Sequence, residues 1–151
     1  MMANTVTIGG VPEGFDADII LRQIHRDGRP LMHIARDDKR LAAFAEAVRF
    51  FAPDMPVIEF PAWDCLPYDR VSPNADISAR RMATLAGLVH GMPKQFILLT
   101  TLNAAIQRLP ARQVLRDAAF RAEVGRPIDE EALRSFLVRM GFSKAPTVLE
   151  P

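Results

Sequence analysis

The feature that most constrains the fold is an alternation of apolar runs with segments of helical period over the first hundred residues. Four apolar runs are expected to be strands: Thr5–Ile8, Pro30–Ala35, Pro56–Phe60 and Gln95–Thr100. Helices are expected over residues 16–28, 37–51 and 77–91, and a short one over 101–110. Strands that alternate with helices are typical of βαβ units around a parallel sheet. The sequence therefore predicts an α/β fold in which helices flank a parallel sheet.

The pattern changes from about residue 111. Residues 118–125 can form an extended segment, and a capped helix is predicted for Asp129–Met140. Residues 147–150 then begin what reads as another strand. We therefore assign residues 1–117 to the main domain and 118–151 to the start of a small α+β second domain. Because that sheet would be incomplete, we expect its open edge either to be mobile or to pair with a second copy of the chain.

Composition excludes several classes of protein. The chain has 151 residues, 49% of them hydrophobic, and a net charge of +1. Such a balance gives no overall field for binding nucleic acid or an anionic membrane. The single cysteine excludes an internal disulfide framework, and neither a signal peptide nor a membrane span is recognisable. We therefore expect a cytoplasmic protein.

A candidate phosphate-binding loop precedes the first predicted helix. Gly9 and Gly14 have the spacing of a P-loop, but Phe15 and Asp16 stand where that loop needs Lys and Ser or Thr. Glu13 adds a second carboxylate near the place where phosphates would lie. We therefore predict that this loop is degenerate and binds no cofactor.

The other candidate reactive groups are scattered. His25, His33 and His90 lack companions at metal-ligand spacing, so no metal site is predicted. Cys65 has acidic neighbours, which would disfavour a reactive thiolate. No Ser-His-Asp pattern occurs. We therefore predict no catalytic residue.

The most unusual stretch, Phe60–Arg81, holds the only Trp, the only Tyr and three prolines. Aromatic residues in a proline-restricted loop can serve recognition, or they can pin the loop to its own domain. Trp63, Leu66 and Tyr68 alternate, which favours the second interpretation. We therefore expect these three side chains to pack onto the α/β core.

The same stretch resembles a known family. The segment WDCLPYDRVSPNADISARRMATLAGL is similar to the signature segment of bacterial transcription-repair coupling factors. The positions that match the signature are Trp63, Leu66, Pro67, Tyr68, Asp69, Ser72, Pro73, Arg81 and Leu85. Residues 98–110 and 124–151 also resemble segments of that family. The resemblance covers about residues 5 to 151.

The resemblance implies a fold and a function. The family's N-terminal module is similar to the helicase-like B subunit of nucleotide excision repair, which has a working P-loop, so the loop at Gly9–Asp16 would be a relic of it. The chain is identified on this basis as an N-terminal fragment with a degenerate helicase-like, P-loop NTPase-like domain. It would be a non-enzymatic scaffold in DNA repair.

The parent protein implied is an ATP-dependent DNA translocase that displaces stalled RNA polymerase and recruits excision repair after DNA damage. ATP and Mg²⁺ would bind in motor domains that lie outside this chain, as would the contacts with DNA and RNA polymerase. Residues 118–151 would begin the domain that binds the excision-repair A subunit.

Two other functions remain open from the residues themselves. One is a nucleotide-binding α/β enzyme that uses the Gly9–Gly14 loop without its lysine. The other is an autonomous DNA-binding domain, which would need a basic face made of Arg80, Arg81, Arg108, Arg112 and Arg116.

Overall fold

The computed structural model describes residues 5–65, 70 and 72–145. The chain divides into two compact units, Met1–Leu109 and Pro110–Pro151. The first unit confirms the predicted α/β class. Its sheet consists of β1 (Leu31–Ala35), β3 (Ile97–Thr101) and β2 (Val57–Phe60), in the spatial order β1-β3-β2. Both pairs of neighbouring strands are parallel.

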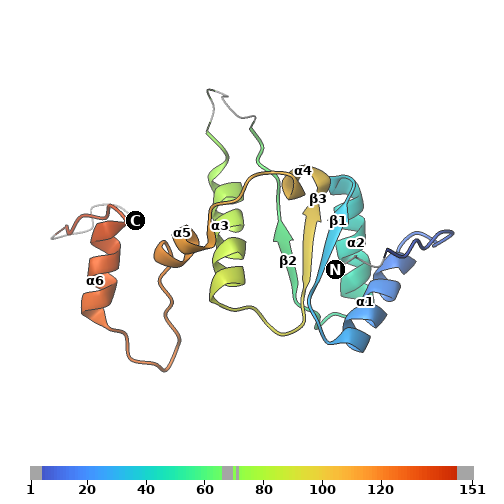
Figure 1. Cartoon of the computed structure of the whole chain (residues 1–151), viewed down its shortest axis with the longest axis horizontal. Helices are drawn as coiled ribbons and strands as arrows, with labels where there is room; N and C mark the ends of the chain where they lie inside the picture. The colour runs from blue at the N-terminus through green and yellow to red at the C-terminus, as the bar shows by residue number, and fades with distance from the viewer. Residues whose placement is uncertain (1–4, 66–69, 71, 146–151) are drawn as a thin grey trace. The chain divides into compact units, whose positions relative to one another are not determined.

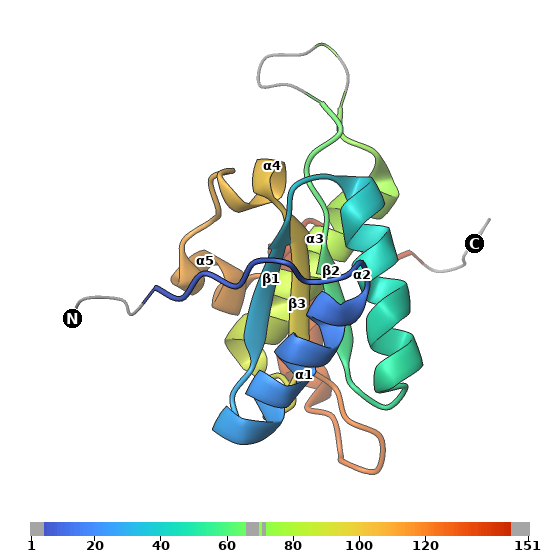
Figure 2. The ribbon, with the colours of Figure 1, turned by 90° about the vertical axis from the view of Figure 1, so that its right-hand side faces the viewer.

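Helices cover both faces of this sheet. On one face lie α1 (Phe15–Asp27) and α2 (Asp38–Phe51), and on the other lies α3 (Ala75–His90), which packs against β2 (Figures 1 and 2). The short helix α4 (Leu102–Ala105) follows β3 directly. The connection through α2 runs from β1 past β3 to β2, and α3 returns the chain to β3 over the opposite face. This arrangement makes β3 the central strand and leaves β1 and β2 as edges.

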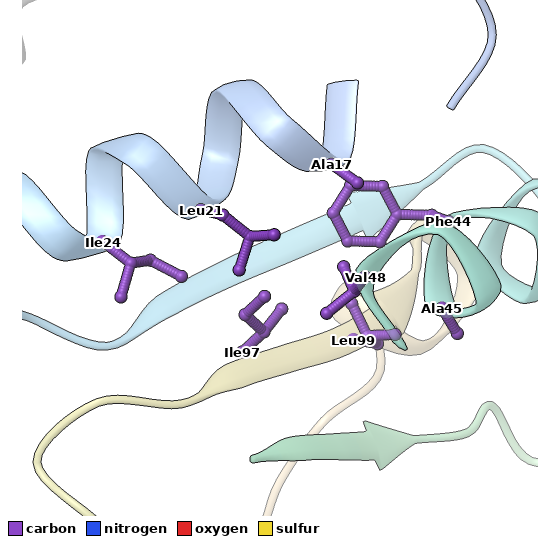
Figure 3. Packing of buried hydrophobic residues seen from close by; sticks show 8 residues of the cluster. All are labelled: Ala17, Leu21, Ile24, Phe44, Ala45, Val48, Ile97 and Leu99. Atoms are coloured by element: carbon purple, nitrogen blue, oxygen red, sulfur yellow. The ribbon is translucent and has the colours of Figure 1, made fainter. Parts of the chain in front are cut away.

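The main core lies between the helix pair and the central strand (Figure 3). Helix α1 contributes apolar residues one and two turns apart, and α2 meets them with its own apolar stripe. Alternate residues of β3 point to the same side. The eight buried residues are Ala17, Leu21, Ile24, Phe44, Ala45, Val48, Ile97 and Leu99.

The helix ends follow local sequence. Helix α1 begins after Gly14 and ends before Gly28, and both glycines have positive φ, 83° and 66°. Helix α2 begins after Asp37, whose side chain accepts a hydrogen bond from the backbone N–H of Arg40. Helix α3 is capped in the same way by Asn74.

The prediction of a strand at Thr5–Ile8 is wrong. These residues have no regular structure, and Val6 and Ile8 are exposed. A strand needs a hydrogen-bonded neighbour, and none of the described strands pairs with this segment.

The second unit contains α5 (Arg112–Asp117) and α6 (Glu130–Arg139). Helix α5 was not predicted. The strand expected within residues 118–125 is also wrong, because these residues form an irregular connection with a turn at Gly125, where φ is 84°. Helix α6 agrees with the prediction, and Asp129 caps it by accepting hydrogen bonds from the N–H groups of Glu131 and Ala132.

The compact unit that contains α5 and α6 begins at Pro110, whereas the sequence placed residues 110–117 in the first domain. The predicted domain limits stay a prediction. The strand expected at residues 147–150 lies outside the described residues. The role of residues 118–151 as a repair-partner-binding domain stays a prediction. Among the described helices, none is long and apolar enough to cross a membrane.

Candidate interaction site after strand β2

The candidate site is the segment that leaves the carboxyl end of β2. Helix α3 holds the outer side of this segment with two side chains. The Thr84 hydroxyl donates to the carbonyl of Glu59 at 3.2 Å, and Nη1 of Arg81 donates to the carbonyl of Pro61. On the inner side, the Thr100 hydroxyl of β3 donates to the carbonyl of Phe60 at 2.9 Å. Three successive carbonyls are therefore fixed by side chains.

Arg81 is the centre of the site. Only 1% of the residue is exposed, and its guanidinium lies between two aromatic rings, 4.2 Å from the centroid of Phe60 and 4.4 Å from that of Trp63. Aromatic faces attract a cation, and a planar guanidinium stacks on them. Burial lowers the pKa of Arg81 from its ordinary value. Its Nε has no hydrogen-bond partner in the part of the chain that the structure describes.

Two further hydrogen bonds hold the segment in place. The backbone N–H of Trp63 donates to Oε1 of Gln107, which follows α4, at 3.2 Å. The carboxylate of Asp64 accepts from the backbone N–H of Asn74, with distances of 3.2 and 3.3 Å to its two oxygens. The second contact joins the two ends of the connection between β2 and α3. Residues 59–64 are thus held by α3, by β3 and by the segment after α4.

The structure describes only part of the signature segment. Leu66, Pro67, Tyr68 and Asp69 lie outside the described residues, so the expected packing of Leu66 and Tyr68 stays a prediction. Trp63 is half-buried against Arg81. The remaining signature residues near the loop differ in exposure, since Ser72 is exposed and Pro73 is half-buried.

The candidate phosphate loop lies elsewhere, at the start of α1. Gly14 is the residue before the helix, Phe15 is the first helical residue and is 46% exposed, and Gly9 lies in the irregular segment before it. The N–H of Phe15 donates to the carbonyl of Pro12 at 3.1 Å. The N–H of Ala17 lies 3.1 Å from the Asp16 carboxylate. Two N–H groups that could face a phosphate therefore already have partners.

Charged groups around this loop also pair with one another. Glu13 accepts a hydrogen bond from Nη1 of Arg40 at 2.6 Å. A small cavity of about 220 Å³ is lined by Asp16, residues 33–36 and Arg40. In it, His33 stacks on Phe44 with ring centroids 3.8 Å apart, and burial lowers the pKa of His33 although the Asp16 charge opposes the shift. The positions after Gly14 that would supply the lysine and the hydroxyl of a phosphate loop are occupied by Phe15 and Asp16.

Two arginines of the possible basic face have other contacts in the structure. Arg80 pairs with Glu59 at 2.6 Å, and Arg81 is buried, so neither is a free surface cation. Among the described residues, no three His, Cys, Asp or Glu side chains converge as metal ligands would.

Curated proteins that share one name are similar in sequence to most of this chain. A transcription-repair coupling factor of Myxococcus xanthus is 33% identical over 138 residues, covering 85% of this chain. Those of Escherichia coli and Haemophilus influenzae are 27% and 28% identical, covering 89% and 95% of this chain. The chain belongs to the transcription-repair coupling factor family. No protein-family model matches it.

The family members are much longer than this chain. The chain spans 11% of the length of the Myxococcus xanthus and Escherichia coli coupling factors and 12% of that from Haemophilus influenzae. The similarity in sequence therefore concerns one part of a coupling factor, and this part includes the segment that Arg81 fixes.

Sequence reasoning missed most of the contacts that organise this coupling-factor segment. Arg81 was part of the signature, but the sequence did not predict that its side chain is buried or which residues it contacts. Gln107 also lay in a segment that resembled the family, without a predicted role. The contacts of Phe60 and Thr84 could not be found from spacing, because Phe60 lies 21 positions before Arg81 in the printed sequence and the sequence does not show which strand α3 covers.

Proposed function

We propose that this chain is a non-catalytic scaffold and interaction module of a transcription-repair coupling factor. In the parent protein, an ATP-driven DNA translocase would displace stalled RNA polymerase and recruit nucleotide excision repair. This module would hold a surface segment in a fixed conformation for the other parts of that machinery. The helicase-like ancestry of its α/β domain belongs to the same proposal.

The observation that carries the proposal is the fixation of residues 59–64. A buried arginine between two rings, with three carbonyls accepting side-chain hydrogen bonds, is a costly arrangement for an ordinary connection. A buried cation is tolerated where its contacts determine one conformation. The arrangement therefore favours a segment whose conformation matters over a mobile linker.

The surroundings of the α1 start support a non-catalytic role. A phosphate site needs a cation and free N–H donors. Here Phe15 replaces the lysine, Glu13 engages Arg40, and the N–H groups of Phe15 and Ala17 have partners. We therefore expect neither ATP nor Mg²⁺ to bind to this module.

Titration with a fluorescent ATP analogue and Mg²⁺ tests this part of the proposal. We expect no saturable binding below millimolar concentration. Micromolar affinity that is lost in Gly14→Val, but kept in Gly125→Val as a matched control, would instead support the nucleotide-binding enzyme. Salt-dependent binding of a short duplex DNA, measured by anisotropy, would support the DNA-binding alternative.

We further propose that residues 118–151 contribute to binding the excision-repair A subunit. In support, Val138 and Phe142 at the end of α6 are 68% and 64% exposed. Exposed apolar side chains are common in protein interfaces. Calorimetry with the purified A subunit should detect binding that Phe142→Ser weakens and Phe50→Ser leaves unchanged. Equal loss in both variants, or no binding by the unsubstituted chain, would contradict this contact.

A further inference from the structure

A groove runs along the outer side of β2, between the end of α2 and the middle of α3. Its volume is about 600 Å³. Strand β2 supplies the floor, and the two helices with their adjoining residues supply the walls. The lining residues that matter here are Arg49, Met55, Val57, Glu59, Arg80 and Ala83. All of them belong to the first unit.

The backbone of β2 is open at the beginning of this groove. The N–H of Ile97 donates to the carbonyl of Pro56 at 2.9 Å, so the groups of Val57 and Glu59 point away from β3. The Thr84 hydroxyl engages the outward carbonyl of Glu59. Within the described residues, no hydrogen bond engages the N–H or carbonyl of Val57 or the N–H of Glu59. These three groups can pair with another backbone.

Helix α3 closes the rest of this edge. The next outward carbonyl is that of Pro61, which accepts a hydrogen bond from Nη1 of Arg81 and has no N–H of its own. A full neighbouring strand would need both of these groups, so the sheet cannot continue past β2 as a regular ladder. This closure depends on residues of the first unit alone. It leaves room for a short segment at the beginning of β2.

Two arginines flank the groove and share one carboxylate. Nη2 of Arg80 lies 2.6 Å from Oε2 of Glu59, whereas Nη2 of Arg49 lies 3.9 Å from Oε1. The longer contact is weak, and the Arg49 side chain is 62% exposed. A guanidinium has five N–H donors in a fork that fits a carboxylate. Arg49 can therefore bind a second carboxylate at the mouth of the groove.

We infer that this groove binds a short extended segment of a partner protein, with an apolar residue next to an acidic one. The backbone of the segment pairs with Val57 and with the N–H of Glu59. Its apolar side chain lies against Met55 and Ala83, and its carboxylate pairs with Arg49. In such binding, backbone hydrogen bonds supply affinity and the side-chain contacts supply specificity. The groove does not depend on the contact proposed for residues 118–151.

A displayed library of random short peptides tests the inference, with the full chain as the target. We expect the enriched peptides to contain Asp or Glu beside an apolar residue. A labelled peptide from this set, measured by anisotropy, should bind Arg49→Glu at least roughly tenfold more weakly. Arg26→Glu is the matched control, since its side chain is 75% exposed on α1, and it should bind normally. A peptide with Lys in place of the acid should regain affinity for Arg49→Glu.

A second pair of variants separates binding from folding. Ala83→Trp fills the groove from an exposed position of α3, and Ala42→Trp makes the same change at an exposed position of α2 outside it. We expect only Ala83→Trp to lose the peptide, while chemical denaturation shows both variants folded. Amide exchange at Val57 and Glu59 should slow when the peptide is bound to the unsubstituted chain.

Several outcomes would overturn the inference. No enrichment, or enriched peptides without acidic residues, would show that the groove does not select such a segment. Equal affinity of Arg49→Glu and Arg26→Glu would place the peptide elsewhere. Loss of the peptide to millimolar inorganic phosphate at constant ionic strength would assign Arg49 to a small anion. Self-association in sedimentation that Ala83→Trp abolishes would identify a second copy of the chain as the occupant.

Discussion

The guanidinium of Arg81 lies 4.4 Å from the centre of the Trp63 ring and connects α3 to the segment that leaves β2. The two residues are 18 positions apart in the printed sequence. Their contact fixes where the signature segment of a coupling factor begins.

Replacing Arg81 should destabilise the first unit. Lysine carries the charge but lacks the planar group that stacks on Phe60 and Trp63. We expect Arg81→Lys to lower the free energy of unfolding by about 1 to 3 kcal/mol, as losing a buried charged hydrogen bond commonly does. Chemical denaturation measures this loss, and iodide should quench Trp63 fluorescence more strongly in the variant.

The neighbouring arginine provides the control for that experiment. The Arg80 side chain is 44% exposed and forms a surface ion pair with Glu59, so Arg80→Lys should change stability by less than about 1 kcal/mol. Equal losses in the two variants would show that stacking between the rings does not stabilise the site.

Substituting Gly14 tests whether the positive φ before α1 requires a glycine. Its φ is 83°, and a Cβ there would meet only Ala47 at 3.9 Å, so space is not limiting. Gly14→Ala should cost about 1 to 2 kcal/mol in unfolding free energy because L-residues disfavour this conformation. Gly9→Ala is the control, since Gly9 has an ordinary φ and open space around it. A stable Gly14→Ala protein would contradict this view of the helix start.

The stability of the first unit should depend on pH through His33. Burial lowers the pKa of His33 in the folded state below the ordinary 6.5, so the folded protein favours the neutral ring. This contribution is fully present above pH 6.5 and is lost as the pH falls through that value toward the lower folded pKa. Thermal midpoints measured between pH 8 and pH 5 should fall toward acid.

A non-titrating ring separates His33 from other groups. His33→Phe keeps a ring that can stack on Phe44 and removes the ionisation. The part of the acid-dependent fall due to His33 should disappear in this variant. An unchanged pH profile would assign the fall to other residues.

Thr84 should contribute through its hydrogen bond to the edge strand. Thr84→Val has nearly the same shape but leaves the Glu59 carbonyl without its donor. We expect a loss of about 0.5 to 2 kcal/mol in unfolding free energy. Ser78→Ala is a suitable control, because the Ser78 hydroxyl donates to the carbonyl of Asn74 within its own helix end. A Thr84→Val protein as stable as the control would indicate that water satisfies the carbonyl equally well.

Local sequence determined the limits of the helices, the state of the candidate phosphate loop and the family resemblance. The spacing of Ile20, Leu21 and Ile24 predicted this helix, and Gly28 predicted its end, because these signals act within a few residues. Leu21 and Ile24 are buried in the structure, whereas Ile20 is partly buried. The missing lysine after Gly14 likewise predicted a degenerate loop, since a phosphate loop needs that residue type at that position. The signature residues indicated the family before the fold was known.

Tertiary structure decided the rest. Residues 5–8 have a strand-like pattern, but a strand forms only when another strand supplies hydrogen bonds, and the pattern of one segment does not specify its neighbours. The order β1-β3-β2 determined that β2 lies beside α3, and so brought Arg81 to the carbonyl of Pro61. The same order placed β1 at one side of the described sheet. Hydrogen bonds between distant segments depend on which elements become neighbours, and that depends on packing of the whole unit.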